Sequence, residues 1–346
     1  MKSGNNVKKI IRNFLLFIVL IFLTLWVILK DQSIMDIISA FDNVKWQYIL
    51  VGIICMGIYI FLEGYNIRRT LKALNENITI MQAIKYSLIG FFFSSITPAA
   101  SGGQPMQVYY MHKDKVSVAN STLALLINLT SMQVVTITIA LISLLFNYKF
   151  MNQVLIILFV IGVALNMSAL SILLISIFSR RLSRALIKLA VKIMIFFRVK
   201  KIWKKKRRLM EELKSYQVNA KYIRNNKKLI LKIVLTTFVQ FIVYYSIAYW
   251  TYRSLGFSGH NIVEITTMQS ILFATVSSIP SPGSVGVSEG AFIEIFRNIY
   301  QEHMIKSATL LHRAINFYLF VLISGIVVIV NDIKTKRNEA ENIEGE

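Results

Sequence analysis

Six long runs of apolar residues dominate the pattern of the chain, and polar segments separate them. A helix needs about 20 predominantly apolar residues to cross the hydrocarbon core of a bilayer. The short second run gains length from Trp46, Gln47 and Tyr48, which favour the membrane interface. The pattern predicts an all-α integral membrane protein, a polytopic helical bundle with six membrane-spanning helices. The runs cover residues 11–29, 49–62, 123–146, 154–178, 229–250 and 314–330.

Two further apolar segments, residues 80–98 and 262–300, contain proline and glycine where a simple span would continue. Irregular backbone at membrane depth is tolerated only where protein buries it or where it lines a wet cavity. We therefore predict two re-entrant hairpins, which enter the membrane from opposite sides. Pro98, Pro280 and Pro282 break the helices. The polar turn residues are Ser101, Gly102, Gly103 and Gln104 in the first hairpin, and Gly283, Ser284 and Gly286 in the second.

The two hairpins resemble each other in sequence. Residues 93–98 have the order Phe-Ser-Ser-Ile-Thr-Pro, and residues 276–280 have the order Val-Ser-Ser-Ile-Pro. Each hairpin follows two spans and precedes a third, so an odd number of spans per unit inverts the second copy. We predict one membrane domain over residues 1–346, with a first repeat at 1–146 and an inverted second repeat at 153–331. Such paired interruptions point to a transporter site at the repeat interface; the alternative is chance recurrence in an Ile- and Ser-rich chain.

Composition and charge agree with a membrane protein and predict its orientation. The chain is 55% hydrophobic and 16% charged, whereas soluble domains have about 45–50% apolar and about 25% charged residues. The net charge is +22, and segment 180–232 alone holds 19 Lys and Arg against Glu211 and Glu212. The positive-inside rule then places both termini, the tail 332–346 and the basic loop 180–228 in the cytoplasm of a cell-membrane protein.

The basic run between residues 200 and 208 has two interpretations. Each Lys or Arg near an anionic leaflet contributes about 1 kcal/mol, so the run either binds anionic lipid or serves only as a topology signal. Membrane phospholipids are the expected partners, and a homo-oligomer is one option. No nucleic acid is expected, because basic charge alone carries no specificity. The run contains Lys200, Lys201, Lys204, Lys205, Lys206, Arg207 and Arg208.

The sequence contains no recognisable catalytic constellation. Its four His residues, at positions 112, 260, 303 and 312, are scattered, and there is no Cys/His metal spacing, Walker loop or GxSxG motif. The lone Cys55 excludes a disulfide within the chain. We predict no cofactor and no metal, and the residues leave enzymatic activity undecided.

Three segments carry a resemblance to a known family. Residues 97–105, with 109–111 after them, resemble the first signature of the lysylphosphatidylglycerol synthase/flippase transmembrane family, and residues 279–289 resemble its second. Arg313 resembles the arginine that the family carries in its last span. The chain departs from many relatives at Gln104, where they have Glu, so one charge is missing from the first hairpin.

The resemblance implies a function in lipid movement. Family members include the membrane half of enzymes that make and flip aminoacylated phosphatidylglycerol. The chain would then be a flippase-like protein for an anionic or aminoacylated phospholipid of the lysylphosphatidylglycerol type, or for a polyprenyl-linked lipid. The first alternative is the membrane component of a phosphatidylglycerol lysyltransferase, whose aminoacyl-transfer domain we do not expect in this chain. The second is a scaffold that recruits a cytoplasmic partner through residues 180–228.

Arg313 and Glu289 are the sharpest site candidates, because an ionised side chain at mid-bilayer costs about 2.5–3.5 kcal/mol on insertion scales. We hypothesise that Arg313 binds a lipid phosphate and that Glu289 holds it in place; the alternative is a structural ion pair. The turn glycines either bring backbone N–H groups to the phosphate or serve tight turns and helix packing. The headgroup-binding set is completed by Ser101, Gly102, Gly103, Gln104, Gly283, Ser284 and Gly286.

Polar residues within the other spans have simpler expected roles. Asn128, Thr130 and Gln133 are expected to make hydrogen bonds between helices. Glu63 and Arg69 fall near the inner end of the second span, where long charged side chains extend to the interface.

Overall fold

The structure is a computed structural model of the chain, and it describes residues 44–97, 100–147, 153–178, 202–277, 279 and 281–344. The secondary structure of these residues is entirely helical, without a strand. The protein is therefore an all-α bundle, as the apolar runs predict. The predicted first span at residues 11–29 lies outside the described residues.

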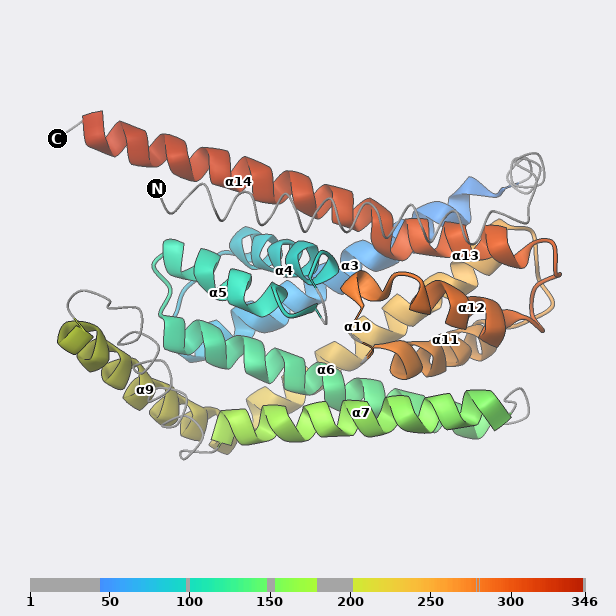
Figure 1. The fold of residues 1–346 in the computed structure, drawn as a ribbon, viewed down its shortest axis with the longest axis horizontal. Coiled ribbons are helices and arrows are strands. Elements are labelled where there is room, and N and C mark those ends of the chain that lie inside the picture. Colours follow the sequence, from blue (N-terminus) through green and yellow to red (C-terminus); the bar gives the residue numbers. More distant parts are fainter. Residues whose placement is uncertain are drawn as a thin grey trace.

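Among the described residues, five helical segments are long and apolar enough to cross a membrane, and each overlaps a predicted apolar run. α3 (Trp46–Ala73) has 28 residues, and a rise of about 1.5 Å per residue makes it about 42 Å long. The last span joins α13 (Ile305–Arg313), η4 (Ala314–Tyr318) and α14 (Leu319–Glu344). It begins earlier than predicted because the polar residues before position 314 are buried in the bundle. The other spans are α6 (Val118–Asn147), α7 (Gln153–Phe178) and α10 (Lys227–Ser254) (Figure 1).

Each predicted hairpin is a pair of short helices with a broken connection. The first pair is α4 (Ile80–Ser95) and α5 (Gly103–Lys113). The second is α11 (Ile262–Val276) and α12 (Val287–Phe296), with the short η3 (Pro282–Ser284) between them. At about 1.5 Å per residue, the 16 residues of α4 reach about 24 Å, less than the hydrocarbon core.

The two hairpins enter the bundle from opposite ends, and their broken ends face each other near its middle (Figure 1). Val285, just after η3, packs in one apolar cluster with Phe92, Phe93 and Ile96 from the end of α4. This arrangement agrees with two opposed hairpins that meet inside the protein. Their depth in a bilayer and the division into inverted repeats stay predictions.

Local capping explains where several helices begin. At α4 the backbone N–H of Gln82 donates to Thr79 Oγ1 at 3.1 Å, and Thr79 N–H donates back to Gln82 Oε1 at 2.8 Å. Asn226 accepts from Leu229 N at 3.1 Å and so caps α10. Such caps satisfy backbone donors that the first helical turn leaves without a partner.

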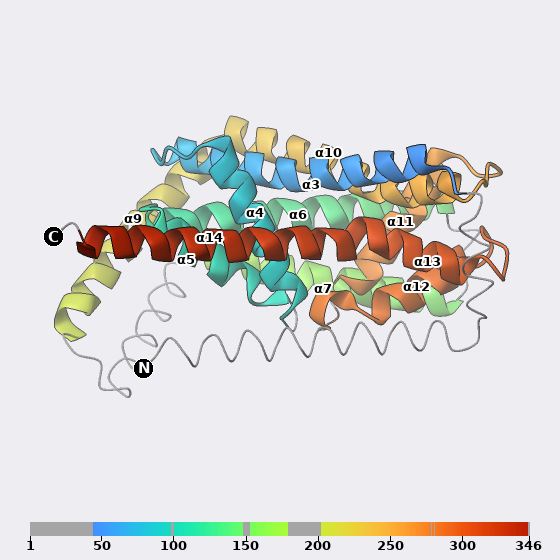
Figure 2. The same ribbon diagram turned by 90° about the horizontal axis from the view of Figure 1, so that it is seen from above.

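α3 and α10 lie side by side along one face of the bundle (Figure 2). Their contact runs over the full length of both helices. At one end Lys45 N donates to Ser254 O at 2.9 Å, and further along Asn66 Nδ2 donates to Thr237 Oγ1 at 3.0 Å. α13 and η4 of the last span pack against this pair, whereas α14 packs against α4.

The segment predicted as a basic loop at 180–228 contains a helix, α9 (Ile202–Asn225). Glu212 Oε2 accepts from Ala119 N at 3.1 Å at the start of α6, and Tyr216 OH donates to Ser176 O of α7 at 3.2 Å. These contacts fix α9 against the ends of two spans. α9 lies at the same end of the bundle as the end of α14 (Figure 1), which agrees with the predicted alternation of the spans. The cytoplasmic location of that end stays a prediction.

Candidate functional site

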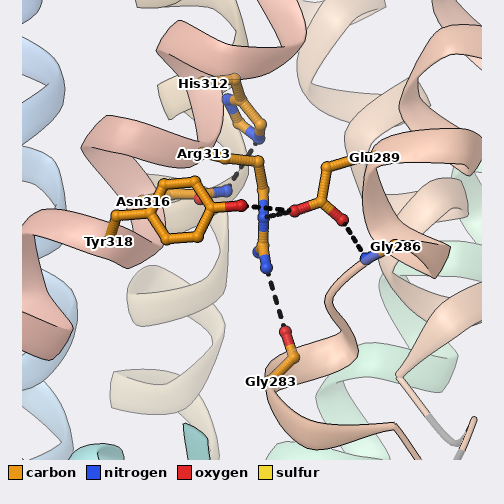
Figure 3. Close-up of polar contacts among 7 residues, drawn as sticks. All are labelled: Gly283, Gly286, Glu289, His312, Arg313, Asn316 and Tyr318. Atoms are coloured by element: carbon orange, nitrogen blue, oxygen red, sulfur yellow. Dashed lines mark hydrogen bonds and ion pairs between the residues drawn. The ribbon is translucent and has the colours of Figure 1, made fainter. Parts of the chain in front are cut away.

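Arg313 and Glu289 form a buried ion pair where the second hairpin meets the last span. Arg313 ends α13, and Glu289 lies in the first turn of α12. Arg313 Nε donates to Glu289 Oε1 at 2.8 Å, and the two side chains are only 7% and 1% exposed. The second oxygen of Glu289, Oε2, accepts from the backbone N–H of Gly286 at 2.7 Å (Figure 3). Both carboxylate oxygens are therefore engaged.

The turn of the second hairpin reaches the same arginine. Arg313 Nη2 donates to the carbonyl oxygen of Gly283 at 3.0 Å (Figure 3). Gly283 has φ 58° and Gly286 has φ 84°, a backbone region that glycine enters without steric cost. A Cβ at position 283 would also lie 2.2 Å from Cζ of Phe317. The turn needs glycine at 283 both for its backbone conformation and for its contact with Phe317.

A π-helical segment, η4, follows Arg313 directly. Tyr318 at its end donates to Glu289 Oε1 at 3.0 Å. The Arg313 guanidinium lies over the ring of Phe317, with Cζ at 4.1 Å from the ring centroid. π-helical turns inside α-helices are rare and are frequently found at functional sites. The segment thus places an aromatic face and a phenol around one guanidinium.

The guanidinium of Arg313 has N–H groups that donate no hydrogen bond to other described residues. Arginine has five N–H donors, and among the described residues Arg313 uses Nε for Glu289 and one N–H of Nη2 for Gly283. Near it, Asn316 Nδ2 and His312 Nε2 lie 2.9 Å apart. The buried atoms His312 Nδ1, Asn316 Oδ1 and Ser281 Oγ have no hydrogen-bond partner within the described part of the chain. Buried polar atoms without partners are costly, so the surroundings suit a polar ligand or water.

Comparison with known proteins agrees with the resemblance seen in the sequence. Residues 14–324 match the family described as "Lysylphosphatidylglycerol synthase TM region". The chain belongs to this family. It is also similar to a UPF0104 membrane protein of Pyrococcus horikoshii, at 23% identity over 335 residues, which is 92% of this chain and 97% of the relative. With its apolar spans, the chain is thus a multi-pass membrane protein of a lipid-related family.

The segment that resembles the first family signature, in the first hairpin, is built differently from the second. Gly102 N–H donates to Thr97 Oγ1 at 2.9 Å, so it serves the turn. A Cβ on Gly103 would lie 2.1 Å from Ser94 Oγ and 2.9 Å from the carbonyl oxygen of Gly90. These glycines therefore fit the predicted alternative of tight turns and close helix packing.

The first hairpin meets the second hairpin and the last span through apolar side chains. Val285 clusters with the end of α4, and Phe91 of α4 and Phe317 of η4 have ring centroids 6.0 Å apart. Ser101 is exposed and Gln104 is half-buried, and among the described residues no hydrogen bond joins either of them to Arg313. Of the predicted breakers, Pro282 starts η3, whereas Pro98 and Pro280 lie outside the described residues.

In the second hairpin of this family member, two backbone N–H groups near the turn already have partners within the described residues. The Gly286 N–H donates to Glu289, and the Gly283 carbonyl accepts from Arg313. Ser284 N–H donates to Ser281 O at 3.2 Å. The turn therefore positions Arg313 and Glu289.

The predicted interhelical hydrogen bonds of α6 come from a different residue. Thr130 Oγ1 donates to Leu126 O of its own helix at 2.7 Å, and Asn128 Nδ2 donates to Met132 Sδ at 3.7 Å. Ser131, between them, contacts Thr237 of α10 at 3.0 Å. The prediction for Asn128 and Thr130 is wrong in the described structure, because the helix turns Ser131 toward its neighbour.

Of the basic residues between 200 and 208, the structure describes the side chain of Arg207. Lys200 and Lys201 lie outside the described residues, as do the side chains of Lys204, Lys205, Lys206 and Arg208. Arg207 is exposed and pairs with Glu211 at 3.1 Å. Anionic-lipid contact through this run stays a prediction.

Sequence reasoning missed Phe317 and Tyr318, which lie within the predicted last span. The only signal was the density of polar and aromatic residues that follows Arg313 in an otherwise aliphatic run. A π-helical segment shifts the helix phase, so helical periodicity alone would not have turned Tyr318 toward Glu289.

Proposed function

We propose that the protein moves a phosphate-bearing lipid between leaflets, with Arg313 as the residue that binds the headgroup. The lipid is an anionic or aminoacylated phospholipid, or a polyprenyl-linked lipid. The observation that carries this proposal is the buried Arg313–Glu289 pair, which lies where a hairpin turn meets the last span. Family membership supports a role with membrane lipid.

The chemistry of the pair fits a site that alternates between empty and loaded states. A planar guanidinium binds phosphate oxygens through two parallel hydrogen bonds and stays protonated. While the site is empty, Glu289 pairs with the guanidinium of Arg313. Tyr318 donates a hydrogen bond to Glu289 and so holds the carboxylate in place. This avoids an unpaired charge in the interior, which is strongly destabilising. A phosphate would use the remaining donors of Arg313 and compete with the carbonyl of Gly283.

The placement of the hairpins supports a route for the headgroup. The headgroup would pass the polar site while the acyl or prenyl tails stay in the surrounding lipid. The turn would move for this passage, since Gly283 contacts both Arg313 and Phe317. Discontinuous helices at a repeat interface are the usual place for such a site.

The test is lipid movement in proteoliposomes made of phosphatidylglycerol with a trace of fluorescent phosphatidylglycerol. Arg313→Ala should abolish protein-dependent movement of the fluorescent lipid, and Arg313→Lys should recover little, because an ammonium cannot reproduce the planar fork. Arg297→Ala is the matched control, since Arg297 is exposed at the end of the same hairpin. Well-folded Arg313→Ala with normal lipid movement would refute the headgroup role.

A purely structural ion pair makes a different forecast. Each single variant, Arg313→Ala or Glu289→Ala, would then lose about 3–5 kcal/mol of stability, and the double variant would recover much of it. Folded yield and unfolding temperature of the three variants separate this outcome from a loss of transport in stable protein.

The family name favours a second candidate, the membrane component of a phosphatidylglycerol lysyltransferase. Lipid extracts of a deletion strain distinguish the two. A loss of aminoacylated lipid would support the enzyme component. Unchanged lipid amounts with an altered distribution between leaflets would support the flippase.

A further inference from the structure

The end of α3 carries three cationic side chains, Arg68, Arg69 and Lys72. Glu63, which was predicted near this end of the span, lies ten residues before the end of the helix, because α3 is longer than its apolar run. Arg69 is engaged with α10, since its Nη1 donates to Thr236 Oγ1 at 2.8 Å. Arg68 and Lys72 point elsewhere, toward the loop that leads into the first hairpin.

Arg68 and Lys72 line a cavity between the end of α3 and the start of α4. Its other lining residues are Asn77, Ile78 and Thr79, and its volume is about 260 Å³. The share of liquid volume that one water occupies is about 30 Å³, so the cavity has room for a phosphate group. Arg68 Nε donates to the carbonyl oxygen of Ile78 at 3.0 Å, which holds the loop against α3. The loop lies at the same end of the bundle as α9 (Figure 2).

No acid neutralises Arg68 or Lys72 within the described residues. Glu76 follows Lys72 at a spacing of four, at which opposite charges pair within a helix. α3 has ended by then, at Ala73. Glu76 Oε1 instead accepts from Ser117 N at 3.2 Å and from Asn120 Nδ2 at 2.8 Å, at the start of α6. The cavity therefore keeps the full positive charge of both side chains.

The groups that line the cavity suit an anion rather than a cation. Arginine has five N–H donors, and within the described residues Arg68 uses Nε alone. Asn77 and Thr79 add an exposed amide and an exposed hydroxyl. A guanidinium binds phosphate oxygens through its planar fork, and an ammonium binds them as a point charge. The chemistry of the cavity thus fits a phosphate ester.

The cavity lies at the level of lipid headgroups. Trp46 is exposed at the other end of α3, and tryptophan favours the membrane interface. Lys72 follows 26 residues later, which is about 39 Å at about 1.5 Å per residue. The hydrocarbon core is about 30 Å thick, and the bilayer with its headgroup regions about 40–45 Å. With Trp46 at one interface, Lys72 reaches the headgroups of the opposite leaflet.

An exposed apolar stripe on α3 leads to the cavity. Ile54, Phe61 and Tyr65 are exposed and lie at helical spacing on one face. Lys72 comes two turns after Tyr65 on the same face. Met81, in the first turn of α4, adds an exposed apolar side chain next to the lining residues. A lipid whose phosphate enters the cavity can therefore lay its acyl chains along α3.

We propose that this cavity binds the phosphate of an anionic phospholipid. Arg68 donates hydrogen bonds to the phosphate oxygens, Lys72 supplies a second charge, and the acyl chains follow the exposed stripe. A lipid with a net negative charge is favoured over a zwitterionic one, because the cavity offers no acid for an ammonium group. The bound lipid joins the end of α3 to the loop before α4. This site is separate from Arg313 and does not depend on lipid movement by the protein.

The test is native mass spectrometry of the purified full chain, stripped of lipid in a nonionic detergent and titrated with dioleoylphosphatidylglycerol. Lys72→Gln should weaken the tightest binding step about fivefold, which corresponds to about 1 kcal/mol for one Lys beside an anionic headgroup. Binding of dioleoylphosphatidylcholine should be weaker and should not change in this variant. Lys72 is exposed and has no ion pair among the described residues, so the variant should keep its unfolding temperature.

Lys228→Gln is the matched control. Lys228 is exposed at the start of α10, at the same end of the bundle, and does not line the cavity. The control should bind phosphatidylglycerol as the native protein does. Equal weakening in both variants would mean that the lipid responds only to the general positive charge of this end, and it would overturn the proposal.

Two further arms locate the site and identify the source of the phosphate. Phosphatidylglycerol with a photoactivatable acyl chain should crosslink to residues 54–81 in the native protein, and this product should decrease in Lys72→Gln. Crosslinks confined to other segments would overturn the proposal. Inorganic phosphate should displace the lipid only at far higher concentration, because it lacks the acyl chains. If inorganic phosphate binds as tightly as phosphatidylglycerol, the cavity serves a soluble phosphate and the lipid assignment fails.

Discussion

Arg313 and Tyr318 bind the same carboxylate oxygen, Oε1 of Glu289, from the two ends of η4. In an α-helix of 3.6 residues per turn, residues five apart point about 140° away from each other. A π-helical turn bonds residue i to i+5 and so brings such residues to one side. The π-helical segment is what allows the guanidinium and the phenol to share one oxygen.

The first prediction concerns the shared oxygen. Tyr318→Phe removes one hydrogen bond to Glu289 and should cost about 0.5–1.5 kcal/mol or somewhat more, because the acceptor is charged. The measurement is thermal unfolding of the purified protein in detergent. Tyr109→Phe, at an exposed tyrosine, should change the unfolding temperature little. An equal effect of both substitutions would contradict the assigned role of Tyr318.

The second prediction concerns the turn of the second hairpin. Gly283→Ala should destabilise the protein, since the backbone has φ 58° and the new Cβ would meet Phe317. The left-handed conformation alone costs about 1–2 kcal/mol for a residue with a Cβ. Adding Phe317→Leu should restore part of the steric loss and none of the backbone cost.

Gly290→Ala is the control for this experiment. Gly290 lies in α12 of the same hairpin, and nothing would lie within 4 Å of an added Cβ there. Alanine is the better helix former, so the control should be neutral or stabilising. If Gly290→Ala destabilised the protein as much as Gly283→Ala, the effect at position 283 would not be specific to its backbone conformation and its contact with Phe317.

The third prediction concerns topology. In a Cys55→Ser background, a cysteine at Ser258 should label from outside intact cells, and one at Ser215 should label only after permeabilisation. Both positions are exposed, and the distribution of basic residues places them on opposite sides. External labelling at Ser215 would reverse the arrangement of the whole bundle.

The fourth prediction concerns pH and α9. Burial raises the pKa of Tyr216 to about 12 from a usual value of 10.0. Folding therefore favours the neutral phenol, and its contribution to stability is present below about pH 10 and is lost as the pH rises through about 12. The hydrogen bond to Ser176 is lost in the same range, and α9 should loosen from α7.

Protease accessibility of α9 as a function of pH is the measurement for this detachment. Tyr216→Phe should make α9 more accessible at neutral pH and remove the alkaline step. Tyr222→Phe, at an exposed tyrosine of the same helix, should leave both unchanged. An alkaline step that persists in Tyr216→Phe would assign it to another group.

The sequence was most informative where a feature depends on local composition. Each described span overlaps its apolar run, since hydrocarbon length imposes the length of the run. The broken hairpins follow from glycine and proline, whose backbone restrictions act within a few residues. Arg313 and Glu289 stood out because ionised groups are rare in apolar segments.

The features that the sequence did not predict depend on tertiary contacts. The role of Ser131 in place of Thr130 is set by the rotation of α6 against α10. Gln107 of α5 donates to the carbonyl oxygen of Tyr86 only because α5 folds back beside α4 and Gly90 leaves space. α9 was predicted as part of a loop because the segment is highly charged. Its charged residues nevertheless include pairs at helical spacing, such as Arg207 and Glu211.

The contact between the hairpin tips has a consequence for the electrical properties of the membrane. Val285 of the second hairpin and Phe317 of the last span belong to the same apolar cluster as Phe92, Phe93 and Ile96 of the first hairpin. A hydrated ion that moved along this junction would have to leave its water behind. We expect this layer to block ions in the described conformation, so a planar bilayer that contains the protein should show no added conductance. The lipid movement that we propose would then occur only in steps that part the tips.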